Sequence, residues 1–195
     1  MSTIVRSLPR PAAGRAVPRG RGRTPYPLDV VYAQAGIAPP KTREIAPERI
    51  PLPYRSLLVH ERDMTLTLEA HFGGRVTLRP LSTFRDGHSY FRRVLLVQEY
   101  SARPVEMGAI RIDLLAFAPR IRAAILKNRV PLGRLLRDGG VDYRSLPTAF
   151  LSVEPNSEMM GVFWMREPRT LFGRQTEMTV DGRKIGDIVE ILPLV

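Results

Sequence analysis

Residues 171–193 read LFGRQTEMTVDGRKIGDIVEILP and contain the clearest local pattern in the chain. Two segments rich in apolar residues flank the dipeptide Asp181-Gly182, which a two-residue type I′ turn prefers. Segments of this composition, bounded by turn residues, are typical of strands. We therefore predict a β-hairpin that turns at residues 181–182.

Three more strands are predicted before this hairpin. They are RVTLRPL at 75–81, YFRRVLLVQ at 90–98 and VEMGAIRIDLLAF at 105–117. Helical periodicity predicts one amphipathic helix or two short ones within 54–74, and further helices within 117–129 and 131–140. Five strands with interspersed helices predict an α+β domain with a single, mainly antiparallel sheet and helices packed on it.

The first 50 residues have a different composition. Ten of the 18 prolines fall at or before Pro53, and no acidic residue precedes Asp29. Proline removes backbone donors and interrupts regular structure. We predict an Arg/Pro-rich tail over 1–50, disordered or extended, and one domain over 51–195. A targeting peptide, a nucleic-acid-binding arm and a misassigned start codon stay open as alternatives for the tail.

Charge and composition exclude several classes of protein. The net charge is +11, but residues 1–50 carry nine basic and three acidic residues, so the tail holds more than half of the excess. We therefore do not expect nucleic acid as the main partner. No apolar run is long enough to span a bilayer, and we expect a cytoplasmic protein without a membrane span. Without cysteine, and with three histidines, no metal site is predicted.

Ionisable residues inside apolar strands are the candidates for chemistry. Side chains alternate between the faces of a strand, so Arg92 and Arg93 cannot share an environment, and a buried guanidinium needs an anion. The other candidates are Arg111, Asp113, Arg174 and Glu190. Structural salt bridges would explain each of them taken alone. Together, arginine and carboxylate in apolar strands suit an anionic organic ligand, and a helix starting near PLG at 131–133 would add backbone donors.

Two further features have a structural interpretation. His60 lies in HERD, on an otherwise solvated helical face, and we expect it to be structural or exposed to solvent. The segment EMMGVFWM at 158–165 is predicted to belong to the core, with a lid over a site as the alternative. No glycine-rich phosphate loop, GxGxxG, HExxH or GxSxG motif occurs, which argues against the common nucleotide, redox and hydrolase sites.

The order of the motifs over 55–195 resembles the chorismate pyruvate-lyase family. The resemblance rests on LLVHERDMTLTLE, GGRVTLR, YFRRVLLV, PLGRLL and the hairpin sequence, in that order. It implies one antiparallel sheet enclosing a ligand pocket, and conversion of chorismate to 4-hydroxybenzoate and pyruvate without metal or organic cofactor. A small-molecule substrate is then the expected partner, and the protein is expected to be a monomer or a weak homo-oligomer.

The resemblance also assigns roles to residues. It places the arginine that binds the ring carboxylate at Arg92, backbone N–H contacts at Met64 and Leu132, and the carboxylate that holds the 4-hydroxyl at Glu190. Arg174 and Arg111 are candidates for the second carboxylate of chorismate. Glu190 follows Gly182 by eight residues rather than the seven of the ubiquinone-pathway branch, so we expect either a β-bulge or membership of a more divergent branch.

Three functions therefore stay open from sequence. The first is a lyase in which Arg92 and Glu190 are the catalytic residues, and which works mainly by positioning its substrate. The second is a non-catalytic module of the same fold that binds a small aromatic acid. The third is a nucleic-acid-binding protein that acts through its arginine-rich tail.

Overall fold

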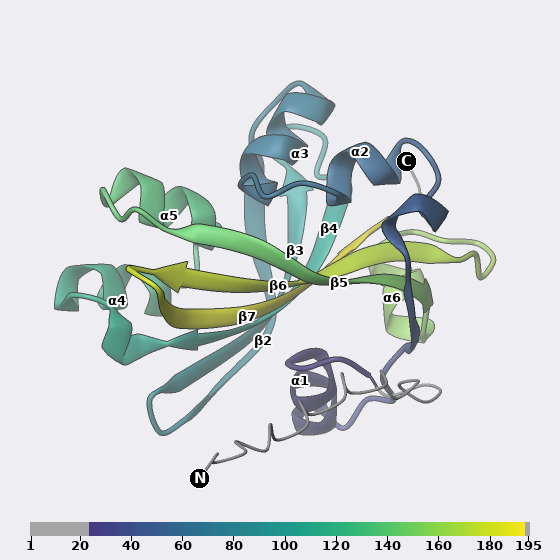
Figure 1. Cartoon of the computed structure of the whole chain (residues 1–195). Coiled ribbons are helices and arrows are strands. Elements are labelled where there is room, and N and C mark those ends of the chain that lie inside the picture. The colour runs from purple at the N-terminus through teal and green to yellow at the C-terminus, as the bar shows by residue number, and fades with distance from the viewer. Residues whose placement is uncertain (1–23, 194–195) are drawn as a thin grey trace, which may run out of the picture.

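The computed structural model describes residues 24–193 and contains one seven-stranded sheet (Figure 1). Its strand order is β1-β5-β6-β7-β4-β3-β2, and every neighbouring pair is antiparallel. Helices pack on the sheet, which confirms the predicted α+β class. No helix in this part of the chain is long and apolar enough to cross a bilayer.

The bounds of the elements are as follows. The strands are β1 Lys41–Ile45, β2 Val76–Asp86, β3 Ser89–Gln98, β4 Pro104–Asp113, β5 Arg144–Glu154, β6 Leu171–Val180 and β7 Arg183–Leu192. The helices are α1 Leu28–Ala35, α2 Tyr54–Leu58, α3 Met64–Phe72, α4 Pro119–Leu126, α5 Leu132–Asp138 and α6 Ser157–Val162, with short 3-10 helices at Pro47–Arg49 and Leu114–Ala116.

The hairpin at 181–182 is confirmed. Asp181 has φ of 49° and Gly182 has φ of 74°, as a type I′ turn requires at both central positions. The ladder contains one irregularity, since Thr179 pairs with Lys184 and Met178 with Gly186. Ile185 is therefore an extra residue in β7, and this β-bulge reverses the alternation of every residue after it.

The region 54–74 forms two short helices, which was one of the two predicted arrangements. Helix α2 ends at Leu58, and α3 starts after Asp63, whose side chain accepts a hydrogen bond of 3.0 Å from the backbone N–H of Leu66. An aspartate in this position caps the first turn of a helix. The cap fixes where α3 begins, and therefore where its free N–H groups lie.

The predicted tail boundary at residue 50 is wrong. Helix α1 lies on the sheet with Leu28, Val31 and Tyr32 at most 1% exposed, and β1 pairs with β5 at the edge of the sheet. The region is rich in proline, α1 is only eight residues long, and β1 is a short, polar edge strand. Neither element therefore gives a clear pattern in the sequence. The prediction for residues 1–23 lies outside the described residues.

Strand β5 was also missed by the sequence prediction. Its sequence, RSLPTAFLSVE, contains a proline and lacks clear alternation, and the register shifts between Pro147 and Ala149. Proline cannot donate to a sheet ladder, which normally argues against a strand. The shift accommodates it, and the sheet has seven strands rather than five.

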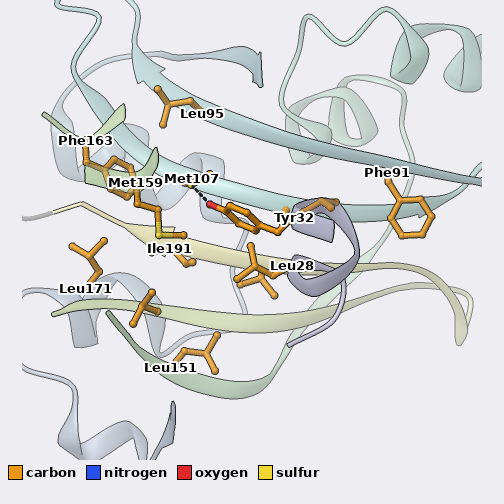
Figure 2. Close-up of a cluster of buried hydrophobic side chains, with 14 of the residues drawn as sticks. Leu28, Tyr32, Phe91, Leu95, Met107, Leu151, Met159, Phe163, Leu171 and Ile191 are labelled. Carbon is orange, nitrogen blue, oxygen red and sulfur yellow. Dashed lines mark hydrogen bonds between the residues drawn. The ribbon is translucent and has the colours of Figure 1, made fainter. Parts of the chain in front are cut away.

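Both faces of the sheet are covered. Helices α1 and α6 cover one face, where their side chains pack against Leu95, Met107 and Ile191 (Figure 2). In this cluster the Tyr32 hydroxyl donates to Met107 Sδ over 3.8 Å. Helices α2 to α5 cover the opposite face, where they complete two further apolar clusters.

The segment 158–165 is divided between core and surface. Met159 is fully buried and Phe163 nearly so, which confirms the core prediction for these two residues. Trp164, two residues beyond the end of α6, is 64% exposed. Its ring therefore contributes little to the core of this face.

Candidate functional site

Arg93 belongs to the face covered by α1 and α6. It is 3% exposed, and its Nη1 donates to Glu158 Oε2 over 2.8 Å. Its guanidinium also lies 4.7 Å from the centroid of the Tyr32 ring, a distance suited to a cation–π interaction. Arg93 thus has an ion-pair partner and an aromatic partner within the fold.

Arg92 points to the opposite face, and within residues 24–193 it has neither an ion-pair partner nor an aromatic one. It is 3% exposed, its Nη1 donates to the amide oxygen of Asn128 over 3.0 Å, and its Nε has no hydrogen-bond partner within residues 24–193. No ion pair involving Arg92 occurs in the same part of the chain. Burial lowers the pKa of Arg92 to about 10, so the guanidinium stays protonated at neutral pH.

A small cavity lies beside Arg92, between the sheet and the starts of α3 and α5. Its lining includes Arg92, Glu106 and Glu190, with apolar side chains from β2, β3, β4 and β7 between them. Its volume is about 70 Å³. One water occupies roughly 10–15 Å³ by this measure, and pockets for drug-sized ligands reach roughly 300–1,000 Å³. The cavity therefore suits a compact ligand.

Glu190 lines the cavity and is also part of a buried ion pair. Arg174 lies opposite it in the β6–β7 ladder and is fully buried, and its Nε–H donates to Glu190 Oε2 over 2.5 Å. The Thr176 hydroxyl donates to the same oxygen over 3.2 Å. The bulge at Ile185 turns Glu190 toward this face, so the bulge predicted as one explanation of the longer spacing is present.

Arg174 also makes hydrogen bonds through its Nη1. Its Nη1 donates to the backbone oxygens of Leu58, over 3.2 Å, and of His60, over 2.8 Å. These contacts tie the α2–α3 connection to the buried ion pair. Its Nη2 is buried without a hydrogen-bond partner within residues 24–193, and Arg174 does not line the cavity, so its role as the partner of a second ligand carboxylate stays a prediction.

Arg111 does not reach the cavity, which corrects its assignment as the other candidate. It is adjacent to Ile110, which lines the cavity, and successive residues of a strand face opposite sides. Its Nε–H donates to the Ser89 hydroxyl over 3.0 Å. Asp113, also singled out from sequence, accepts a hydrogen bond from the backbone N–H of Leu115 and pairs with Arg183 at 3.2 Å.

The sequence prediction missed Glu106. This residue of β4 is 5% exposed, lines the cavity, and its Oε2 has no hydrogen-bond partner within the described residues. Burial raises the pKa of Glu106 well above its usual value, and the nearby Glu190 carboxylate raises it further, while Arg174 lowers it. Arg92 was identified from sequence because it is a charged residue within an apolar strand. The same pattern occurs in VEMGAI, where Glu106 is the charged residue.

The starts of two helices complete the cavity wall. Met64 is the first residue of α3 and Leu132 the first residue of α5, and both line the cavity. The first N–H groups of a helix have no partner within the helix. Gly133 allows the two starts to meet, because a Cβ at this position would collide with Asp63 Oδ2 and approach Tyr143 Oη to 2.8 Å.

His60 lies near the site without lining the cavity. Its Nε2 lies 2.8 Å from the backbone oxygen of Leu57, and its Nδ1 lies 3.4 Å from Arg174 Nη1. Burial and then the Arg174 charge lower the pKa of His60, which favours the neutral ring. The contacts are those of a structural histidine, one of the two expectations from sequence.

No family model matches this chain, and no curated protein matches it. Among solved structures, gene product SA0254 from Staphylococcus aureus is similar at 5% identity, covering 69% of this chain and 90% of its own, with a TM-score of 0.49. The ligand-binding domain of a putative GntR-family transcriptional regulator from Bordetella bronchiseptica follows at 15% identity, 60% and 85% coverage and a TM-score of 0.47. PhnF from Mycobacterium smegmatis has 13% identity, 91% and 89% coverage and a TM-score of 0.48. Similarities of this strength do not assign a family or a function.

Proposed function

We propose that the cavity binds a small organic acid whose carboxylate pairs with Arg92. The observation that carries this proposal is the buried guanidinium of Arg92, whose one side-chain partner among the described residues is the neutral amide of Asn128. A buried charge without a counter-charge is costly, and a bound carboxylate would remove that cost. Arginine is also suited to holding a carboxylate through two hydrogen bonds.

The charges around the cavity favour a ligand with one negative charge. Glu190 is balanced by Arg174, and the raised pKa of Glu106 favours its neutral acid form. Arg92 is then the uncompensated charge in the lining. A monocarboxylate would neutralise it, whereas a second carboxylate would need a cation that the lining does not supply.

The walls and the volume favour a single ring. The cavity lining includes the apolar residues Val94, Leu96, Ile110 and Ile188, and apolar walls with a few placed polar groups are typical of small-molecule sites. A compact aromatic acid such as 4-hydroxybenzoate combines one carboxylate, one ring and one hydroxyl. We propose this class of ligand.

Cleavage of chorismate to 4-hydroxybenzoate and pyruvate is the second candidate. Its support is that four residues assigned by the sequence resemblance, Met64, Arg92, Leu132 and Glu190, all line one cavity. In this function Arg92 orients the ring carboxylate and Glu190 the hydroxyl, and elimination is driven by formation of the aromatic ring. Neither Arg111 nor Arg174 lines the cavity, and Arg174 pairs with Glu190, so the second carboxylate of chorismate has no assigned cation among the lining residues.

Calorimetry and a turnover assay on the 195-residue chain test both candidates. The proposed function predicts saturable binding of 4-hydroxybenzoate that Arg92→Met weakens about tenfold to a hundredfold, as expected for a hydrogen bond to a charged group. Arg79→Met, a matched change on the exposed side of the neighbouring strand β2, should leave binding unchanged. Release of pyruvate from chorismate without added metal would establish the lyase, and binding without release would establish a non-catalytic module. The proposal is contradicted if 4-hydroxybenzoate does not bind, or if Arg92→Met binds it as tightly as the unaltered protein does.

A further inference from the structure

Glu106 is a buried carboxyl in the cavity lining, and no ion pair of Glu106 occurs within residues 24–193. Glu190 has both Arg174 and Thr176, whereas Oε2 of Glu106 has no hydrogen-bond partner in residues 24–193. Buried polar atoms in folded proteins are nearly always hydrogen-bonded, and an exception that faces a cavity points to a ligand. A purely structural carboxylate would be expected to have its own cation.

The strand register places Glu106 and Arg92 at different ends of the cavity. Arg92 pairs with Ile110 in the β3–β4 ladder, and Glu106 lies four residues away from Ile110 along β4. Four residues of a strand span about 13 Å. Because both side chains line the same cavity, one ligand in it can contact both.

Two local features aim the Glu106 side chain. Leu96 pairs with Glu106 and Val97 with Pro104, so Val105 is an extra residue and forms a β-bulge directly before Glu106. Gly108 then leaves space beside the carboxyl, because a Cβ at that position would lie 3.2 Å from Glu106 Oε1 and 3.3 Å from Val94 Cγ2. Bulges are frequent next to functional sites, where they redirect a side chain.

The chemistry of Glu106 in this position is that of a donor. The groups that act on it are Glu190, Arg174 and Asp63, and the effects of burial and the two acids favour its neutral form over the effect of Arg174. A neutral carboxyl carries an O–H, which donates, where a carboxylate would only accept. The ligand group that matches it is an oxygen able to accept a hydrogen bond.

We propose that Glu106 determines ligand specificity by donating a hydrogen bond to an oxygen at the end of the ligand opposite its carboxylate. This inference rests on the proposed function, in which Arg92 holds the carboxylate. It narrows the ligand class to monocarboxylates with a hydroxyl or carbonyl oxygen across the ring. A benzoate without a para oxygen would leave the Glu106 donor unsatisfied.

Calorimetric titration with three ligands tests the inference: benzoate, 4-hydroxybenzoate and 4-formylbenzoate, whose carbonyl oxygen can only accept. The unaltered protein should bind both para-substituted acids about five- to tenfold more tightly than benzoate, the effect of one hydrogen bond. Glu106→Gln keeps a donor and should keep this preference. Glu106→Leu removes the donor at similar volume and should bind all three ligands within about twofold of one another.

The outcomes separate this inference from the proposed function. If Glu106→Leu keeps the preference, or if the unaltered protein does not favour 4-formylbenzoate over benzoate, the inference is wrong while aromatic acids still bind. The comparison of 4-formylbenzoate with benzoate uses the unaltered protein, so it tests the role of Glu106 even if Glu106→Leu does not fold. If no aromatic acid binds, the proposed function fails and the role of Glu106 fails with it.

Discussion

Arg174 and Glu190 lie directly opposite each other in the β6–β7 ladder and form an ion pair that is almost completely removed from solvent. The pair sits beside the cavity, and one of its members lines it. The neighbouring Arg92 has no such counterpart among the residues that the structure describes. Of these two buried arginines, Arg92 is therefore the one available to bind a ligand carboxylate, and Arg174 holds the fold together.

Arg92 and Arg93 should respond differently to substitution. Arg92→Ala is expected to weaken ligand binding with little loss of stability, because no ion pair is broken in the described structure. Arg93→Ala removes the partner of Glu158, and breaking a buried pair costs about 3–5 kcal/mol in the free energy of unfolding. Urea denaturation and calorimetry on both variants measure the two effects. Equal losses of stability would contradict the assignment of Arg93 as structural and Arg92 as ligand-binding.

Replacing Arg174 should destabilise the fold strongly. Arg174→Met leaves the Glu190 charge buried without its cation, and we expect a loss of about 3–5 kcal/mol. The double variant Arg174→Met, Glu190→Gln should recover part of this loss, since the uncompensated charge is gone. A double-mutant cycle by urea denaturation checks this, and strictly additive effects would show that the two side chains do not interact.

Glu106 should make stability fall with rising pH. Its pKa in the folded protein is raised above the ordinary value of 4.5, so the folded state binds a proton that the unfolded state has lost. The stabilisation from this proton is complete below the unfolded pKa and disappears as pH rises through the folded pKa. The slope is at most about 1.4 kcal/mol per pH unit.

Glu106→Gln provides the control for this pH dependence because the amide does not titrate. The difference in unfolding free energy between the variant and the unaltered protein should grow in favour of the variant as pH rises above 4.5. Urea denaturation at several pH values gives this difference directly. A difference that stays constant with pH would mean that Glu106 is ionised in the folded protein.

Gly133 should not tolerate a side chain. A Cβ there would collide with Asp63 Oδ2 and crowd Tyr143 Oη, and overpacking of this kind costs roughly 1–3 kcal/mol. Gly161→Ala is a matched control in α6, because a Cβ at that position meets no atom within 4 Å. Thermal unfolding of both variants tests the contrast. Similar melting temperatures would show that the starts of α3 and α5 are not held closely together.

The sequence predicted the elements whose pattern is local. The Asp181-Gly182 hairpin, the strand around Arg92 and the split region 54–74 all depend on residues a few positions apart. Strands β1 and β5 were missed because their stability comes from pairing across the sheet: β1 is a polar edge strand, and β5 contains Pro147 at a register shift. Propensity does not report such distant pairing.

The candidate site was predictable only in part. Alternation showed that Arg92 and Arg93 face different sides, but it could not identify Glu158 as the partner of Arg93, because that partner lies 65 positions away on α6. Glu106 was passed over in favour of Arg111 in the same strand. Alternation places the two residues on opposite faces of β4, but which face holds the cavity depends on which helices cover the sheet, and that is not visible in one sequence.

The bulge at Ile185 has a consequence for comparing this chain with others. Because one extra residue in β7 restores the direction of Glu190, an insertion between the turn and this glutamate changes the spacing in the sequence without moving the carboxylate to the other face. An alignment that forbids gaps inside strands would pair Glu190 with a neighbouring residue of opposite orientation. A comparison with distant homologues should therefore allow a gap after the turn. The face of the sheet to which the glutamate points is a better criterion than the number of residues between it and the turn glycine.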